Sequence, residues 1–122
     1  MLRYANCGHL SPLLLRAHNH PNGCEWLAST CTVLGLFEKW QSEIAEVHLE
    51  PGDTLVLYTD GVTEAANEEG EEFGEERLLR SLMADVQLPV AELMQSIFRQ
   101  VQRFSHGEQQ DDITLVIARR VQ

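Results

Sequence analysis

The feature that most constrains the fold is a long amphipathic stripe near the C-terminal end of the chain. Apolar residues recur there at steps of one, three and four residues: Val90, Leu93, Met94, Ile97, Phe98, Val101 and Phe104. This spacing places them on one face of an α-helix, and Pro89 suits its first turn because the missing N–H needs no partner there. A partner-binding helix is the alternative, but such a stripe more often marks a buried face. We therefore predict a core-packing helix over residues 89–104.

The other apolar runs are shorter and lie between turn residues. A second amphipathic pattern predicts a helix over residues 75–86. Strands are predicted at 2–7, 12–17, 24–28, 44–49, 54–58 and 113–118. A turn at residues 18–23 and the Pro51-Gly52-Asp53 sequence predict two hairpins, 12–17 with 24–28 and 44–49 with 54–58. Strands followed by two helices and a final strand indicate the α+β class, a mainly antiparallel β-sheet with two α-helices packed on one face.

The charge balance excludes several classes of partner. The chain has 9 basic and 19 acidic residues, for a net charge of −10. Such a chain repels phosphate backbones and anionic lipid surfaces, so we predict no nucleic acid and no membrane as partners. The N-terminus lacks the long apolar centre of a secretory signal, and three cysteines are an odd number for a disulfide framework. We therefore expect a soluble, cytoplasmic protein.

Seven glutamates and no basic residue occupy residues 64–76. Crowding of like charges predicts a solvated, mobile loop. An EF-hand beginning at Asp60 would need Asp or Asn in place of Val62 and Glu64, and Gly in place of Ala65. A calcium loop of that type is therefore excluded.

Acidic residues stand beside two strand-like runs. Residues 54–58 lead into Asp60 and Gly61, while Asp111 and Asp112 lead into the apolar run that starts at Ile113. An Asp-Gly pair alone is more often a plain turn, but two adjacent acids repel each other unless a cation or base lies nearby. Carboxylates held at strand tips with no nearby Cys or His suit Mg²⁺ or Mn²⁺ rather than zinc. Only one of the adjacent acids can point the same way as Asp60, because side chains alternate along an extended segment.

Other chemistries fit the sequence less well. The spacing of six candidate ligands does not match a structural zinc site: Cys7, His9, His18, His20, Cys24 and Cys31. No Gly-x-Ser-x-Gly sequence is present for a serine nucleophile, and no glycine loop has the spacing that cradles phosphate.

Several blocks of sequence lie in an order typical of one enzyme family. They occupy residues 4–9, 12–15, 34–36, 49–64, 73–78 and 111–115, and they include Pro51-Gly52-Asp53, Tyr58-Thr59-Asp60-Gly61-Val62-Thr63-Glu64 and Asp111-Asp112-Ile113-Thr114-Leu115. Their order and spacing resemble the SpoIIE-like branch of the metal-dependent, 2C-type (PPM) protein serine/threonine phosphatases, which includes bacterial regulators of anti-sigma pathways. The resemblance covers nearly the whole chain and implies a single domain over residues 1–122.

The resemblance implies a hydrolase that removes phosphate from phosphoserine or phosphothreonine in a regulatory protein of a sigma-factor pathway. Two Mg²⁺ or Mn²⁺ ions serve the full domain of this family. By resemblance, Asp60 and Asp111 are metal ligands and act in catalysis through the metal. Gly61 belongs to the same metal site and allows close backbone approach. Asp112 supports the ligands without binding metal itself.

The family also carries its own Gly-Asp and Gly-His-Gly metal motifs in its first half. No Gly-His-Gly sequence occurs here, and no Gly-Asp pair occurs besides Gly52-Asp53 of the Pro-Gly-Asp block. We therefore expect an apparently incomplete domain, its C-terminal half, which binds metal weakly and is inactive alone. Missing strands would leave sheet edges and apolar faces bare, so the expected partners include a second copy of the chain or a complementing N-terminal half. The alternative is a non-catalytic interaction or dimerisation module that retains part of the phosphatase fold.

Overall fold

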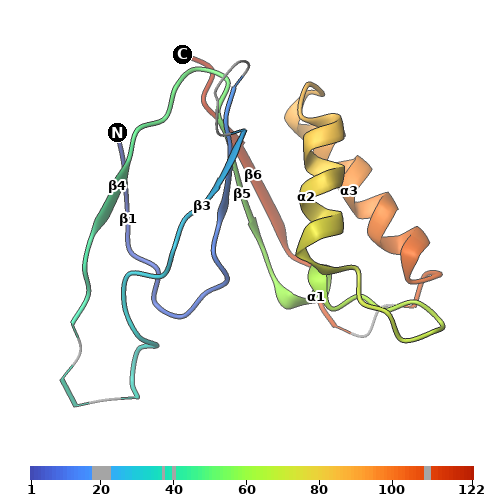
Figure 1. Cartoon of the computed structure of the whole chain (residues 1–122), viewed down its shortest axis with the longest axis horizontal. Helices are drawn as coiled ribbons and strands as arrows, with labels where there is room; N and C mark the ends of the chain where they lie inside the picture. The colour runs from blue at the N-terminus through green and yellow to red at the C-terminus, as the bar shows by residue number, and fades with distance from the viewer. Residues whose placement is uncertain (18–22, 37, 40, 109–110) are drawn as a thin grey trace. The chain divides into compact units, whose positions relative to one another are not determined.

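A computed structural model describes residues 1–17, 23–36, 38–39, 41–108 and 111–122. Its elements run in the order β1 (Leu2–Tyr4), β2 (Leu13–Leu15), β3 (Cys24–Trp26), β4 (Ala45–Val47), β5 (Thr54–Tyr58), α1 (Asp60–Thr63), α2 (Gly74–Asp85), α3 (Val90–Phe104) and β6 (Leu115–Arg119) (Figure 1). Each predicted strand and both predicted helices have a counterpart, so the α+β class is confirmed. Most of the predicted turn at 18–23, together with His18 and His20, lies outside the described residues.

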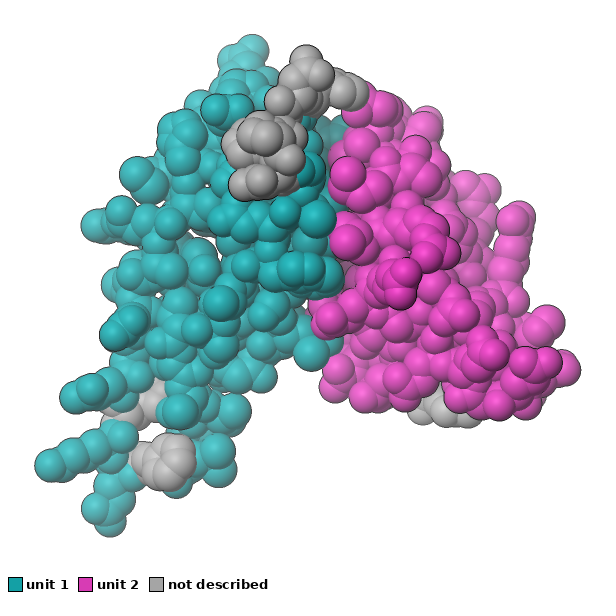
Figure 2. Space-filling view, viewed as in Figure 1, with its two compact units in different colours: residues 1–55, 119–122 teal, residues 56–118 magenta. Residues whose placement is uncertain are grey.

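The chain divides into two compact units, residues 1–55 with 119–122 and residues 56–118 (Figure 2). In the first unit, β1 pairs antiparallel with β4, and β2 pairs antiparallel with β3 as the sequence predicted. Leu14, Leu27 and Val47 form a buried cluster. Four partly buried residues pack against this cluster: Leu2, Tyr4, Leu49 and Leu55.

The predicted hairpin between residues 44–49 and 54–58 is wrong. β4 belongs to a two-stranded sheet with β1, whereas β5 belongs to a four-stranded sheet of order β3-β2-β5-β6. The turn between them forms backbone hydrogen bonds with Arg120, near the C-terminal end of the chain. Gly52, in a left-handed conformation with φ of 91°, donates its N–H to the Arg120 carbonyl, and the Arg120 N–H is donated to the Asp53 carbonyl at 2.9 Å. The turn therefore joins the two sheets and is not the loop of a hairpin.

A buried ion pair holds this turn in the first unit. The Asp53 side chain is 1% exposed and accepts a hydrogen bond from Arg16 Nη1 at 2.9 Å. It also accepts the backbone N–H groups of Ala17 at 2.7 Å and Glu50 at 2.9 Å. Burial acts to raise the pKa of Asp53, but the hydrogen bonds from Glu50, Ala17 and Arg16 outweigh it, and the net pKa is lowered.

The second unit holds the three helices, with α2 and α3 packed against each other. Both long helices lie on the same side of the β5 and β6 strands (Figure 1). Their buried side chains are Leu78 and Leu82 on α2 and Leu93, Ile97 and Val101 on α3. At the far end of α2, Asp85 accepts a hydrogen bond from Ser96 Oγ at 2.5 Å. The predicted apolar stripe therefore does face the core, although Met94 and Phe98 at its border are 42% and 41% exposed.

The acidic stretch 64–76 is more ordered than the sequence indicated. Asn67 Oδ1 accepts the N–H groups of Glu69 and Glu71, and the Phe73 N–H is donated to the Ala65 carbonyl at 2.7 Å. Glu75 and Glu76 lie in the first turn of α2, where carboxylates favour the positive end of the helix dipole. The stretch is thus a hydrogen-bonded loop followed by a helix start.

None of the helices in the described part of the chain reaches both the length and the hydropathy that a bilayer span requires.

Candidate metal centre

The first half of the candidate site lies where β5 gives way to α1. Tyr58 is buried at the end of the strand, Thr59 is extended with φ of −109° and ψ of 167°, and α1 begins at Asp60. The Asp60 carbonyl accepts the Glu64 N–H at 2.8 Å, and Val62 is buried beneath the turn. A short helix therefore replaces the simple turn that the Asp-Gly pair predicted, and the Asp60 side chain is exposed at its start.

Gly61 lies directly against the segment that enters β6. A Cβ atom added at Gly61 would stand 2.0 Å from the carbonyl oxygen of Asp112 and 2.7 Å from its carbonyl carbon. Both atoms belong to the backbone, so no side-chain movement could relieve the overlap. Only glycine allows α1 and residues 111–113 to approach this closely.

Thr59 binds the same segment from the other side of Gly61. Its N–H is donated to the Thr114 carbonyl at 3.1 Å, and its Oγ1 accepts the Thr114 N–H at 3.0 Å. The Thr59 hydroxyl also donates to the Asp112 carbonyl at 3.4 Å. Sequence reasoning assigned Thr59 no role. No local pattern could have revealed this role, because the Thr59 side chain does not cap α1 and its partners lie more than fifty residues away in the sequence.

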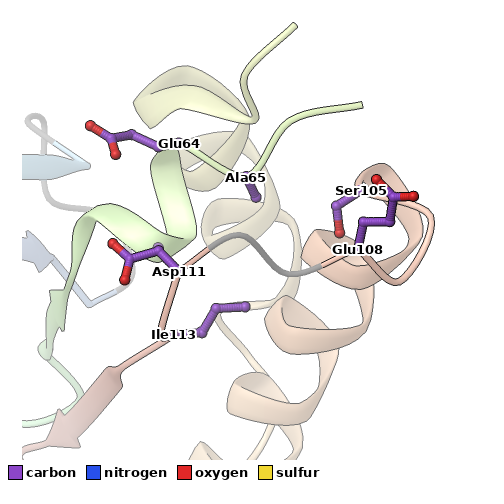
Figure 3. A pocket seen from close by; sticks show the side chains of 7 residues that line it. Glu64, Ala65, Ser105, Glu108, Asp111 and Ile113 are labelled. Atoms are coloured by element: carbon purple, nitrogen blue, oxygen red, sulfur yellow. The ribbon is translucent and has the colours of Figure 1, made fainter. Parts of the chain in front are cut away.

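A cavity of about 280 Å³ opens beside this junction. Its lining comes from α1 and the residues after it, from the end of α3, and from the approach to β6: Gly61, Glu64, Ala65, Ser105, Glu108, Asp111 and Ile113. Figure 3 shows Glu64 and Asp111 on one side of this space and Ser105 and Glu108 on the other. Among the described residues that line the cavity, three carry carboxylates and none is basic, so their field favours a cation.

The sequence-predicted site residues are brought together only in part. Gly61 and Asp111 line the same cavity, whereas Asp60 is not part of its lining. Asp111 Oδ1 accepts the Asp112 N–H at 2.7 Å, and Asp112 contributes its carbonyl to the contact with Thr59 and Gly61. Across the described residues, no three acidic, histidine or cysteine side chains form a group that could hold a metal ion.

Tyr58 fixes the start of α2 beneath the site. Its hydroxyl donates a hydrogen bond to Glu75 Oε1 at 2.9 Å. Burial raises the pKa of Tyr58 strongly, and the Glu75 hydrogen bond and the negative charges of Glu75 and Asp60 raise it further. The phenol therefore stays protonated at neutral pH and keeps the hydrogen bond that joins β5 to α2.

The donor atoms are of the kind that a hard divalent cation prefers, but the number of ligands among the described residues is too small for a full coordination shell. Asp60, Asp111 and the two glutamates of the cavity offer only oxygen atoms, which Mg²⁺ and Mn²⁺ prefer. The described residues nevertheless form no group of three such ligands.

The chain is similar to two proteins of known sequence. It is 31% identical over 120 residues to Protein IcfG of Synechocystis sp., a match that covers 98% of this chain and 18% of that protein. It is 34% identical over 89 residues to Phosphoserine phosphatase RsbU of Bacillus subtilis, covering 72% of this chain and 26% of that protein. The chain thus spans about a quarter or less of the length of these relatives.

Solved structures show the same fold. The SiaA-PP2C domain of Pseudomonas aeruginosa superposes with a TM-score of 0.74 at 22% identity, over 96% of this chain and 45% of that one. The phosphatase domain of SpoIIE from Bacillus subtilis, presoaked with Mn, gives a TM-score of 0.61 at 16% identity, over 98% of this chain and 55% of that one. The family model described as Stage II sporulation protein E (SpoIIE) matches residues 1–121. The chain therefore belongs to the SpoIIE family, and its fold is part of the PP2C phosphatase fold.

Proposed function

We propose that residues 1–122 belong to one metal-dependent phosphatase domain that removes phosphate from phosphoserine or phosphothreonine in a bacterial regulatory protein. The family match runs through both compact units, which supports a single domain. The similarity to a phosphoserine phosphatase supports the reaction. The regulatory substrate and the cytoplasmic location follow from the resemblance and the composition, and both remain predictions.

The observation that carries the proposal is the junction between the tip of β5 and the approach to β6. Gly61 meets the Asp112 backbone there, and Thr59 hydrogen-bonds the same segment, so Asp60 and Asp111 are placed by rigid neighbours. The manganese treatment of a related phosphatase domain supports Mn²⁺ or Mg²⁺ as the cofactor.

In this proposal Asp60 and Asp111 are metal ligands, and other segments of the domain supply the remaining ligands. When bound, two such ions would provide Lewis-acid activation of water and would neutralise the phosphate. The residues of this chain position the site. Gly61 leaves room for close backbone approach, Thr59 holds the segment of Asp111 and Asp112, and the carboxylates of the cavity attract the cations.

Calorimetric titration of the chain with Mn²⁺ tests the ligand assignment. We expect Asp60→Asn and Asp111→Asn each to weaken Mn²⁺ binding about tenfold or more, because each variant removes a charged ligand. Glu68→Gln is the matched control, since it removes the same charge from an exposed position in the loop after α1. Equal weakening in all three variants would indicate a general charge effect and contradict the assignment.

Turnover tests the reaction itself. A phosphoserine peptide and a generic phosphate ester are offered to the chain with Mn²⁺ and then with excess chelator. Any turnover should require the metal and should be lost in Asp60→Asn. Turnover that survives the chelator or the substitution would rule out the proposed chemistry.

A second candidate function is a non-catalytic interaction module that acts as a homodimer or binds a complementing half. Four aliphatic side chains of the first unit support it, because they are between 46% and 68% exposed: Val33, Leu34, Leu36 and Ile44. If no metal-dependent turnover is found, light scattering tests the second function by measuring whether the chain forms a dimer. The double variant Leu34→Ser with Leu36→Ser should then lose the dimer, whereas Val121→Ser, at an 84% exposed position, should keep it.

A further inference from the structure

Two thiols of the first unit lie in direct contact. Cys31 Sγ and Cys7 Sγ are 2.9 Å apart, and Cys31 Sγ also lies 3.2 Å from the Asn6 carbonyl. Both side chains are partly exposed, so small solutes can reach them. The two sulfurs are therefore close enough to bond without a large movement of either residue.

Backbone hydrogen bonds around the two cysteines hold their thiols in contact. Residues 7 and 31 form an isolated parallel β-bridge, and the Asn6 carbonyl accepts the N–H groups of Thr30 at 3.1 Å and Cys31 at 3.2 Å. Gly8, with φ of 90°, lies so close to Val33 that an added Cβ would stand 2.3 Å from Val33 Cγ2. The contact between the sulfurs is thus supported by the pairing of two segments.

A structural metal is the competing explanation for adjacent thiols. Zinc requires further ligands beside two thiols, and the described residues contain no group of three His, Cys, Asp or Glu side chains suited to metal. The third cysteine, Cys24, stands in β3 opposite Leu15 of β2 and provides an internal reference. The arrangement is a pair of thiols.

We propose that Cys7 and Cys31 are a redox pair that a peroxide converts to an intramolecular disulfide. In the first step the thiolate of one cysteine of the pair attacks one oxygen of hydrogen peroxide, the O–O bond breaks, and a sulfenic acid and hydroxide result. The hydroxide takes up the proton that this thiol released and becomes water. In the second step the sulfur of the other cysteine attacks the oxidised sulfur, the S–O bond breaks, and the hydroxyl leaves as water with the proton of the attacking thiol. Two thiols lose two electrons, and the peroxide is reduced to two molecules of water.

The surroundings of Cys7 favour its protonated form. The hydrogen bond with Cys31 raises the pKa of Cys7, and burial adds to the effect. A protonated thiol attacks peroxide slowly, so the first step requires that one of the two thiols lose its proton. In a reducing compartment such a disulfide is transient and reports the redox state.

Peptide mapping tests the proposal on the whole chain. The protein is exposed to hydrogen peroxide, its remaining thiols are blocked with N-ethylmaleimide, and it is digested with trypsin and a glutamate-specific protease. Trypsin releases Cys7 in residues 4–16, and cleavage after Glu25 separates Cys24 from Cys31. We expect a linked pair of peptides that contains Cys7 and Cys31, one blocked thiol at Cys24, and recovery of all three thiols after reduction.

Three serine variants complete the test. Cys24→Ser should form the same disulfide at an unchanged rate, whereas Cys7→Ser and Cys31→Ser should form no intramolecular bond. Serine is close in size to cysteine, and circular dichroism checks that each variant is folded before oxidation. Free alkylation of both Cys7 and Cys31 after peroxide treatment, or cross-links that contain Cys24 or join two chains, would overturn the proposal.

Discussion

At the scale of single residues, Gly61 has the most demanding position in the site. Its missing side chain leaves space for the Asp112 backbone, and an added Cβ would overlap the carbonyl oxygen at 2.0 Å. We expect Gly61→Ala to lower the free energy of unfolding by about 2–4 kcal/mol, because backbone would have to shift, and to weaken Mn²⁺ binding as well. Urea unfolding and Mn²⁺ titration measure the two effects. The control is Gly70→Asn, since a Cβ at Gly70 meets nothing within 4 Å and Asn tolerates its φ of 82°. Equal losses in both variants would contradict the close-approach role.

The buried charge of Asp53 should make the free energy of unfolding depend on pH. The carboxylate is buried with Arg16, and its pKa in the folded state is below the ordinary value of 3.8. A lowered pKa means that its stabilising contribution is present above that ordinary value and is lost as the pH falls through the folded-state pKa. We expect Asp53→Asn to cost about 2–4 kcal/mol at pH 7, because the amide cannot accept every hydrogen bond of the carboxylate.

The gap in unfolding free energy between the wild type and Asp53→Asn should therefore narrow as the pH falls below the ordinary value of 3.8. Urea titrations at pH values above and below it measure the gap. Glu46→Gln is the control, because the ion pair of Glu46 with Arg3 is exposed and its loss should change stability little at any pH. A gap that stays constant with pH would contradict the role of the Asp53 charge.

At the scale of elements, α3 offers a matched test of its packing face. Leu93 is fully buried and the adjacent Met94 is 42% exposed, although both side chains are of similar size. Leu93→Ala should lower the unfolding free energy by about 2–5 kcal/mol, because it leaves a cavity in the core. Met94→Ala should cost less than about 1 kcal/mol. Similar losses for both, measured by urea unfolding, would show that the helix does not pack as described.

The two long helices also show how much of an element can be predicted from the spacing of its residues. The repeats of three and four residues predicted both helices closely, since a helix face depends on local spacing. Which residues of the stripe are buried depends on the contact with α2. The aromatic pair Phe73 and Phe104, with ring centroids 5.5 Å apart, and Arg77 stacked on Phe104 at 4.7 Å come from segments that are distant in sequence.

At the scale of the whole molecule, the net charge of −10 should limit stability at low ionic strength. Repulsion among the acidic residues acts over about 30 Å at 10 mM salt and about 8 Å at 150 mM. We expect the melting temperature to rise by about 2–4 °C when NaCl is raised across this range, because screening favours the compact state. A temperature scan at several salt concentrations measures the shift. Its control is the same scan near the isoelectric point of about 4.8, where the rise should disappear.

The sequence by itself determined the α+β class, the two long helices, the family and the residues proposed for the metal site, because spacing, charge and motif order are local properties. Only the tertiary structure showed that β4 and β5 lie in different sheets, since Pro51-Gly52-Asp53 reads as a hairpin turn until Arg16 and Arg120 are seen to bind it. Only the structure revealed the closeness of Gly61 to Asp112, the role of Thr59 and the contact between Cys7 and Cys31. Each of these joins segments more than twenty residues apart, and the distance between such segments is decided by packing of the whole fold.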